Sequence, residues 1–194
     1  MKLGIDIGSV SAKVVVIDDA ETIIESRYVR TMGQPVETFL AILEELLAAY
    51  PAAAFTMAGA TGTGGQLVAD LLGIPFVNEI TAQAAGTVHF HPDVQTILEI
   101  GGEDSKLIVL ERESPGSLPK VGDFALNGVC AAGTGSFLDQ QASRMGIPIE
   151  EFGDVALKSE HPPRVAGRCS VFAKSDMIHL QQVGTPVHDI VAGL

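Results

Sequence analysis

A short motif that occurs twice constrains this 194-residue chain more than any other feature. Residues 5–13 read IDIGSVSAK, and residues 98–106 read LEIGGEDSK. Both copies have an acid, a glycine two residues later and a lysine seven residues after the acid, with a constant offset of 93 residues between the copies. A repeat of this kind predicts two similar half-domains, 1–94 and 95–194, that face each other across a cleft.

The residues of the first copy suggest a phosphate site. Gly8 and Ser9 predict a tight turn, because glycine adopts backbone angles that other residues resist. The N–H groups of such a turn, helped by the hydroxyls of Ser9 and Ser11, can hold phosphate oxygens. Asp6 would then hold Mg²⁺ through water, and Lys13 would offset phosphate charge. The alternative is an ordinary hairpin with a solvated lysine, which would not need to repeat its acid and lysine in register.

Composition excludes several classes of partner. The chain is 46% hydrophobic, which is enough for a core, and its net charge of −12 argues against nucleic acid or an anionic membrane as a partner. No apolar run of eighteen residues occurs, so we expect neither a signal peptide nor a transmembrane helix. With only two cysteines, we expect a cytoplasmic protein without a structural disulfide.

The hydrophobic pattern predicts an α/β chain in which each half begins with three strands and a helix. In the first half we expect strands at 2–8, 12–18, 22–30, 54–58 and 74–77, and helices at 36–50, 66–72 and 81–89. In the second half we expect strands at about 95–100, 105–111 and 119–126, and helices at about 135–145, 150–158 and 170–182. Because no later strand follows, the second sheet would be incomplete at Leu194, and we expect a fragment or a module completed by something beyond it.

The two cysteines, Cys130 and Cys169, each precede a patterned helix and have small neighbours. Helix N-termini carry unsatisfied N–H groups and partial positive charge, which stabilise thiolates and thiolate-ligated iron–sulfur clusters. A [4Fe–4S] cluster usually takes four thiolates, which a symmetric dimer sharing one cluster would supply. From the residues alone, two buried structural thiols remain an alternative. A catalytic cysteine would need a histidine placed locally to activate it, and the sequence has none there. Residues 133–136 (GTGS) open the first of these helices and are a rival phosphate site.

Two further predictions concern the helices and the core. Asp176 and His179 stand one turn apart on the second cysteine helix, where they would either face a partner or form a solvated pair. Phe124, Phe137 and Phe172 are expected in the core.

These segments resemble the ATP-dependent activators of 2-hydroxyacyl-CoA dehydratases, a group shared with the ATPase subunits of benzoyl-CoA reductases. Both belong to the acetate kinase, sugar kinase, Hsp70 and actin superfamily. The likeness covers essentially the whole chain and is most specific in the cysteine segments, since the nucleotide motifs alone mark only the superfamily. The segments that carry it are GIDIGSVSAKVVV, ATGTGG, NEITAQAAG, LEIGGEDSKL, NGVCAAGTGSFLDQQA and GRCSVFAKSDMI. The resemblance implies an actin-like ATPase fold of two ribonuclease H-like half-domains, the second incomplete at its C-terminus.

The resemblance also implies roles. A homodimer would share one [4Fe–4S] cluster, receive an electron from reduced ferredoxin or flavodoxin, bind ATP or ADP with Mg²⁺, and drive the electron into a dehydratase or CoA-ester reductase. Cys130 and Cys169 would ligate the cluster, and Asp6, Glu103 and Asp104 would be catalytic. The phosphate loops would consist of Gly8, Ser9, Val10, Ser11, Ala12 and Lys13, and of Gly101, Gly102, Glu103 and Asp104.

The chain departs from the family pattern at three points. Glu103 stands where the family carries glutamine, and ATGTGG replaces the more usual ATGYGR. The family's adenine-binding Gly-Gly segment would lie beyond residue 194, so we expect this chain to bind nucleotide weakly. Two alternative functions are a small-molecule kinase of the same superfamily, with GTGS as its phosphate loop, and a non-catalytic ATP-binding regulatory module.

Overall fold

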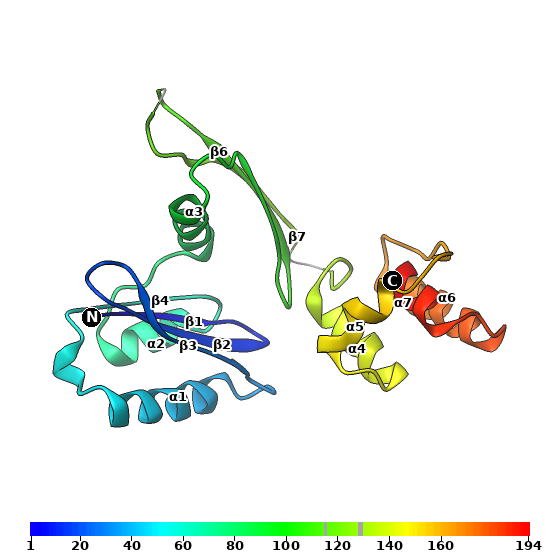
Figure 1. Cartoon of the computed structure of the whole chain (residues 1–194), viewed down its shortest axis with the longest axis horizontal. Coiled ribbons are helices and arrows are strands. Elements are labelled where there is room, and N and C mark those ends of the chain that lie inside the picture. Colours follow the sequence, from blue (N-terminus) through cyan, green and yellow to red (C-terminus); the bar gives the residue numbers. More distant parts are fainter. Residues whose placement is uncertain (115, 128–129) are drawn as a thin grey trace. The chain divides into compact units, whose positions relative to one another are not determined.

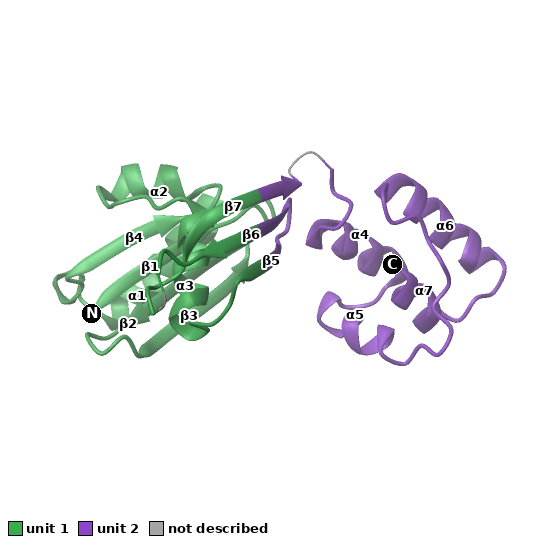
Figure 2. Ribbon diagram, turned by 90° about the horizontal axis from the view of Figure 1, so that it is seen from above, with its two compact units in different colours: residues 1–97, 108–124 green, residues 98–107, 125–194 purple. Residues whose placement is uncertain are grey.

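The computed structural model describes residues 1–114, 116–127 and 130–194. These residues form two compact units, which Figure 2 distinguishes by colour: 1–97 with 108–124, and 98–107 with 125–194. The division falls within a three-stranded sheet of order β5-β6-β7, formed by Thr96–Ile100, Ser105–Glu111 and Lys120–Asn127. The predicted half-domains, 1–94 and 95–194, are defined by the repeated motif, and their boundaries differ from those of the compact units. They remain a prediction.

A four-stranded sheet of order β3-β2-β1-β4 organises the first unit. Its strands are β1 (Lys2–Ile7), β2 (Ser11–Ile17), β3 (Ile23–Arg30) and β4 (Met57–Thr61). β1 pairs antiparallel with β2 and parallel with β4. The buried side chains of Leu3, Ile5 and Ile7 alternate with more exposed residues, so β1 has one core face.

The helices of the first unit follow from the apolar spacing. α1 (Pro35–Ala49) buries Phe39, Ile42 and Leu46, which share one helix face, in the same cluster as the core side of β1 and β2. Figure 1 shows α1 running along this sheet. α2 (Gly65–Leu72) ends at Gly73, whose φ of 66° makes it the C-cap that the sequence predicts.

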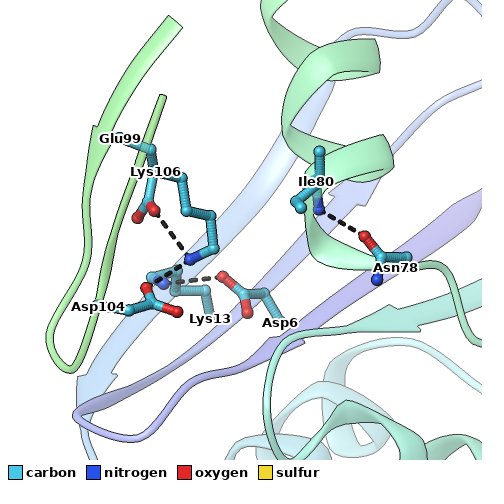
Figure 3. A network of polar contacts seen from close by, with 7 residues as sticks. All are labelled: Asp6, Lys13, Asn78, Ile80, Glu99, Asp104 and Lys106. Atoms are coloured by element: carbon cyan, nitrogen blue, oxygen red, sulfur yellow. Dashed lines mark hydrogen bonds and ion pairs between the residues drawn. The ribbon is translucent and has the colours of Figure 1, made fainter. Parts of the chain in front are cut away.

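α3 (Glu79–Phe90) has a side-chain cap, because Asn78 Oδ1 accepts the N–H of Ile80 at 2.9 Å (Figure 3). Its buried residues Ala84 and Val88 pack in one cluster with Ile108 of β6. This cluster is separate from the core of the four-stranded sheet.

The helices of the second unit are α4 (Gly135–Met145), α5 (Ile149–Ala156), α6 (Ser170–Gln182) and α7 (Val187–Gly193). Ala142 of α4, Phe152 of α5 and Val191 of α7 form their buried cluster. No helix among the described residues is both long and apolar enough to cross a bilayer.

Several local predictions are wrong. The strand expected at 54–58 is present but shifted: it runs from Met57 to Thr61 as β4, after a 3-10 turn, η1 (Ala52–Ala54). The segment 74–77 makes only one isolated bridge, between Phe76 and Ala60. Phe137 is buried as expected, but Phe124 and Phe172 are 51% and 65% exposed. The pattern also does not predict α7.

Candidate functional site

The turn between β1 and β2 forms the first candidate phosphate loop. Gly8 donates its N–H to the Ser11 carbonyl at 2.9 Å, which closes the predicted turn. Ser9 at its tip is exposed, whereas Ser11 is buried. The loop therefore presents Ser9, while Ser11 lies with the sheet.

Asp6 and Lys13 are cross-strand partners at the base of this turn. Lys13 Nζ lies 2.8 Å from Asp6 Oδ2 (Figure 3), and both side chains are partly exposed. The carboxylate predicted for Mg²⁺ and the cation predicted for phosphate are thus paired with each other. The hairpin register accounts for the seven-residue spacing between them.

A glycine loop after β4 packs against the same end of β1. Gly62 has a φ of 88°, and a Cβ there would overlap Asp6 Oδ1 and the Ile7 carbonyl oxygen. The N–H of Gly64 donates to that carbonyl at 2.8 Å. Only glycine allows the loop to approach this closely, so ATGTGG serves to pack the backbone beside Asp6.

The second copy of the motif repeats the first in the second unit. Gly101 donates its N–H to the Asp104 carbonyl at 2.9 Å, which is the Gly8–Ser11 bond displaced by the same 93 residues. Glu103, at the tip of the turn, is exposed. The sequence repeat is therefore also a repeat of turn geometry.

Lys106 is more enclosed than its counterpart in the first motif. Its Nζ lies 3.0 Å from Glu99 Oε2 and 2.5 Å from Asp104 Oδ1 (Figure 3), and its side chain is only 7% exposed. Because one lysine balances two carboxylates, this cluster has a net negative charge when all three groups are ionised. Such a charge favours a cation over bare phosphate, so a phosphate group would approach this turn together with a cation such as Mg²⁺.

The start of α4 is bonded to the second turn. Gly135 and Ser136 donate their N–H groups to the carbonyls of Gly101 and Gly102 at 2.8 and 2.9 Å, and Thr134 donates to Ala131 at 3.2 Å. These first amides already have acceptors, so the rival interpretation of GTGS as a phosphate loop is not supported. Gly135 and Ser136 therefore attach the start of α4 to the second turn by hydrogen bonds.

The two cysteines lie near helix starts, and neither forms a disulfide. Cys169 is the N-cap residue of α6 and is partly exposed, whereas Cys130 is exposed and lies upstream of α4. Cys130 follows residues 128–129, which are outside the described part of the chain. Two accessible thiols fit a metal cluster better than they fit a pair of buried structural thiols.

The segment that leads to Cys169 is bound at two points. Asp189 Oδ1 accepts the Ser159 hydroxyl at 2.6 Å, and Asp176 Oδ2 accepts the N–H of Ala166 at 3.0 Å. The carboxylate of Asp176, expected to face a partner or solvent, thus has a bonding partner within the unit. The hydrogen bond from Ser159 holds the pKa of buried Asp189 below its usual value, and its burial opposes that effect.

A family model matches nearly the whole chain. The BadF/BadG/BcrA/BcrD ATPase family model covers residues 3–194. The chain belongs to the BadF/BadG/BcrA/BcrD ATPase family. This membership confirms the resemblance carried by the nucleotide and cysteine segments.

Curated relatives of this ATPase include activators of dehydratases. The chain is 31% identical over 196 residues to the (R)-2-hydroxyglutaryl-CoA dehydratase activating ATPase of Acidaminococcus fermentans, covering 99% of the chain and 72% of the relative. It is 29% identical over 194 residues to the 2-hydroxyisocaproyl-CoA dehydratase activator of Clostridioides difficile, covering 99% and 70%. It also matches one of the subunits of the benzoyl-CoA reductase of Thauera aromatica at 28% identity, over 59% of the chain and 39% of the relative.

Solved structures support the same fold. Component A of the A. fermentans (R)-2-hydroxyglutaryl-CoA dehydratase matches with a TM-score of 0.87 and 30% identity, covering 99% of this chain and 72% of that one. The activator of the 2-hydroxyisocaproyl-CoA dehydratase from Clostridium difficile, solved with bound ADPNP, matches with a TM-score of 0.84 and 29% identity, covering 99% and 69%. The mixed α/β, actin-like ATPase fold predicted for this family member is therefore confirmed.

Proposed function

We propose that this family member is an ATP-dependent activator that delivers a low-potential electron to a 2-hydroxyacyl-CoA dehydratase or a related CoA-ester reductase. Family membership supports the ATPase part, and the names of the relatives support the partner. The two turns at Gly8–Ser11 and Gly101–Asp104 would hold the ATP phosphates. Asp6, Glu103 and Asp104 would act on Mg²⁺ and the attacking water.

One observation carries this proposal: α4 is bonded to the second turn at its first two amides. The carbonyls of Gly101 and Gly102 accept the N–H groups of Gly135 and Ser136, and Cys130 lies just upstream of that helix. A ligand that shifts the turn must therefore shift the start of α4 or break these bonds. This link couples phosphate chemistry to a thiol in the same unit.

The donor set fits a cluster held by two copies of the chain. No group of three or more metal-binding side chains occurs among residues 1–114, 116–127 and 130–194, so one copy offers Cys130 and Cys169 and a second copy would supply two more thiolates. Val171 and Phe172, next to Cys169, are 66% and 65% exposed and would be covered in such a dimer. When bound, a [4Fe–4S] cluster would store and release one electron at low potential.

The proposed cycle couples the transfer of one electron to the hydrolysis of ATP. Reduced ferredoxin or flavodoxin supplies one electron, and one electron leaves for the partner. ATP and water become ADP and phosphate in the same cycle. Loss of the γ-phosphate removes contacts to the turns, and the hydrogen bonds of Gly135 and Ser136 transmit that change to α4. The chain thereby makes electron release depend on the nucleotide state.

Anaerobic iron and sulfide analysis tests this function. The purified protein should be brown and hold about four iron atoms per dimer. Cys130→Ala and Cys169→Ala should each abolish that iron, whereas the neighbouring variant Ala131→Ser should keep it. A colourless dimer with no iron would refute the electron-transfer function. If that protein instead phosphorylated a sugar, it would belong with the kinases of the superfamily.

A further inference from the structure

Thr31 contacts the first candidate phosphate loop from the residue that follows β3. Its hydroxyl donates to the Ser9 carbonyl at 3.1 Å, and its backbone N–H donates to the Val10 carbonyl at 2.9 Å. Thr31 is only 2% exposed, so both donors lie where they have little access to water. Two consecutive carbonyls of the loop are therefore held by one buried residue.

These two bonds set the direction of the loop amides. In a trans peptide the C=O and the N–H of the next residue point to opposite sides. Holding the Ser9 carbonyl towards Thr31 turns the Val10 N–H to the opposite side. Holding the Val10 carbonyl does the same for Ser11. An anion site of backbone amides needs this kind of fixed direction, because its binding energy depends on preorganised donors.

Thr31 is itself fixed from the side of α1. Its carbonyl accepts the N–H of Gln34 at 2.8 Å, across a turn in which Met32 and Gly33 have φ values of 48° and 82°. Thr38 of α1 donates its hydroxyl to the Gln34 carbonyl at 2.7 Å. Hydrogen bonds through Thr31 and Gln34 therefore connect the first phosphate loop to the first turn of α1.

We infer that Thr31 is a positioning residue for phosphate binding, and that its hydroxyl orients the Ser9–Val10 peptide. This inference rests on the proposed nucleotide function and adds to it a residue outside the repeated motif. Valine has nearly the same shape but cannot donate, so Thr31→Val would leave the Ser9 carbonyl without its donor at a contact with a buried side chain. The peptide would then lose its fixed direction, and phosphate binding would weaken while the sheet persists.

Binding of ATP with Mg²⁺ to the whole chain, measured by calorimetry, tests this role. We expect Thr31→Val to bind ATP about fivefold more weakly than the wild type, and Thr31→Ala to bind about fivefold more weakly than Thr31→Ser. Each pair differs mainly in the hydroxyl. The far-UV circular dichroism spectrum should be the same in every variant. A general loss of structure would change that spectrum together with ATP affinity.

The control is Thr56→Val, which removes a hydroxyl bonded to the Met1 carbonyl at 3.1 Å. It should leave ATP affinity unchanged. Should Thr31→Val fail to fold, the Ser and Ala pair still isolates the hydroxyl. Equal ATP affinity within both pairs would overturn the role of Thr31 while leaving the nucleotide function intact. A wild-type chain that binds no ATP would overturn the nucleotide function and this role together.

Discussion

Lys106 lies 3.0 Å from Glu99 across the β5–β6 hairpin, as Lys13 lies 2.8 Å from Asp6 across the β1–β2 hairpin. The two pairs differ in how deeply the lysine is buried and in how many carboxylates it contacts. Lys106 is 7% exposed and also meets Asp104, whereas the Lys13 side chain is 40% exposed and pairs with one carboxylate. The same motif therefore forms an enclosed ion cluster in one unit and a solvated pair in the other.

We predict that Lys106→Met destabilises the protein much more than Lys13→Met. Removing Lys106 leaves two partly buried carboxylates facing each other, which should cost about 2 kcal/mol. Removing Lys13 breaks a solvated pair, which should cost less than about 1 kcal/mol. Urea denaturation of both variants measures the difference. Equal losses would mean that burial does not distinguish the two pairs.

Gly62→Ala should be more damaging than Gly73→Ala. Both glycines have positive φ, of 88° and 66°, so either substitution strains the backbone by about 1–2 kcal/mol. Only at Gly62 would the added Cβ also overlap Asp6 and Ile7, because nothing lies within 4 Å of a Cβ at Gly73. Gly62→Ala should therefore lower both stability and ATP affinity, measured by thermal melting and calorimetry. A Gly62→Ala protein that matched Gly73→Ala in both respects would show that the close approach is dispensable.

The repeated motif could be predicted well because its signal is local. Turn glycines and alternating apolar residues indicate hairpins, and the bonds Gly8–Ser11 and Gly101–Asp104 follow from them. The pairing of Asp6 with Lys13 also had a signal, since a hairpin turn between them makes residues seven apart cross-strand neighbours.

Structures that depend on tertiary contacts could not be predicted in this way. α7 contains β-branched residues with modest helix propensity, and it is stabilised by burying Ile190 and Val191. The segment around Phe76 is apolar like a strand, but Pro75 lacks an N–H and the pairing stops at one bridge. Thr31 carries no sequence signal, because its role depends on a loop 22 residues away.

Asp176→Ala should loosen the segment that precedes Cys169. The carboxylate accepts the N–H of Ala166, and without it that amide exchanges with solvent. We expect about tenfold faster hydrogen exchange at Ala166, corresponding to about 1.4 kcal/mol, with Asp176→Asn showing a smaller change because it keeps an acceptor. If cysteine alkylation of Cys169 also quickens, Asp176 positions that thiol. Unchanged exchange at Ala166 would show that this bond does not hold the segment.

Asp189 should make the second unit sensitive to acid. The hydrogen bond from the Ser159 hydroxyl lowers the pKa of Asp189 most, and burial raises it. The backbone N–H of His161 and the charges of His188 and His161 lower the pKa further. A carboxyl group whose folded pKa lies below its unfolded value of 3.8 stabilises the fold at pH above that value. That stability is lost as pH falls below 3.8 through the folded pKa. Asp189→Asn should therefore flatten the decline in stability below about pH 4, measured by urea denaturation at several pH values. If stability declines equally with pH in Asp189→Asn and in the wild type, the Ser159 and His161 hydrogen bonds stabilise the protonated and the ionised carboxyl group equally.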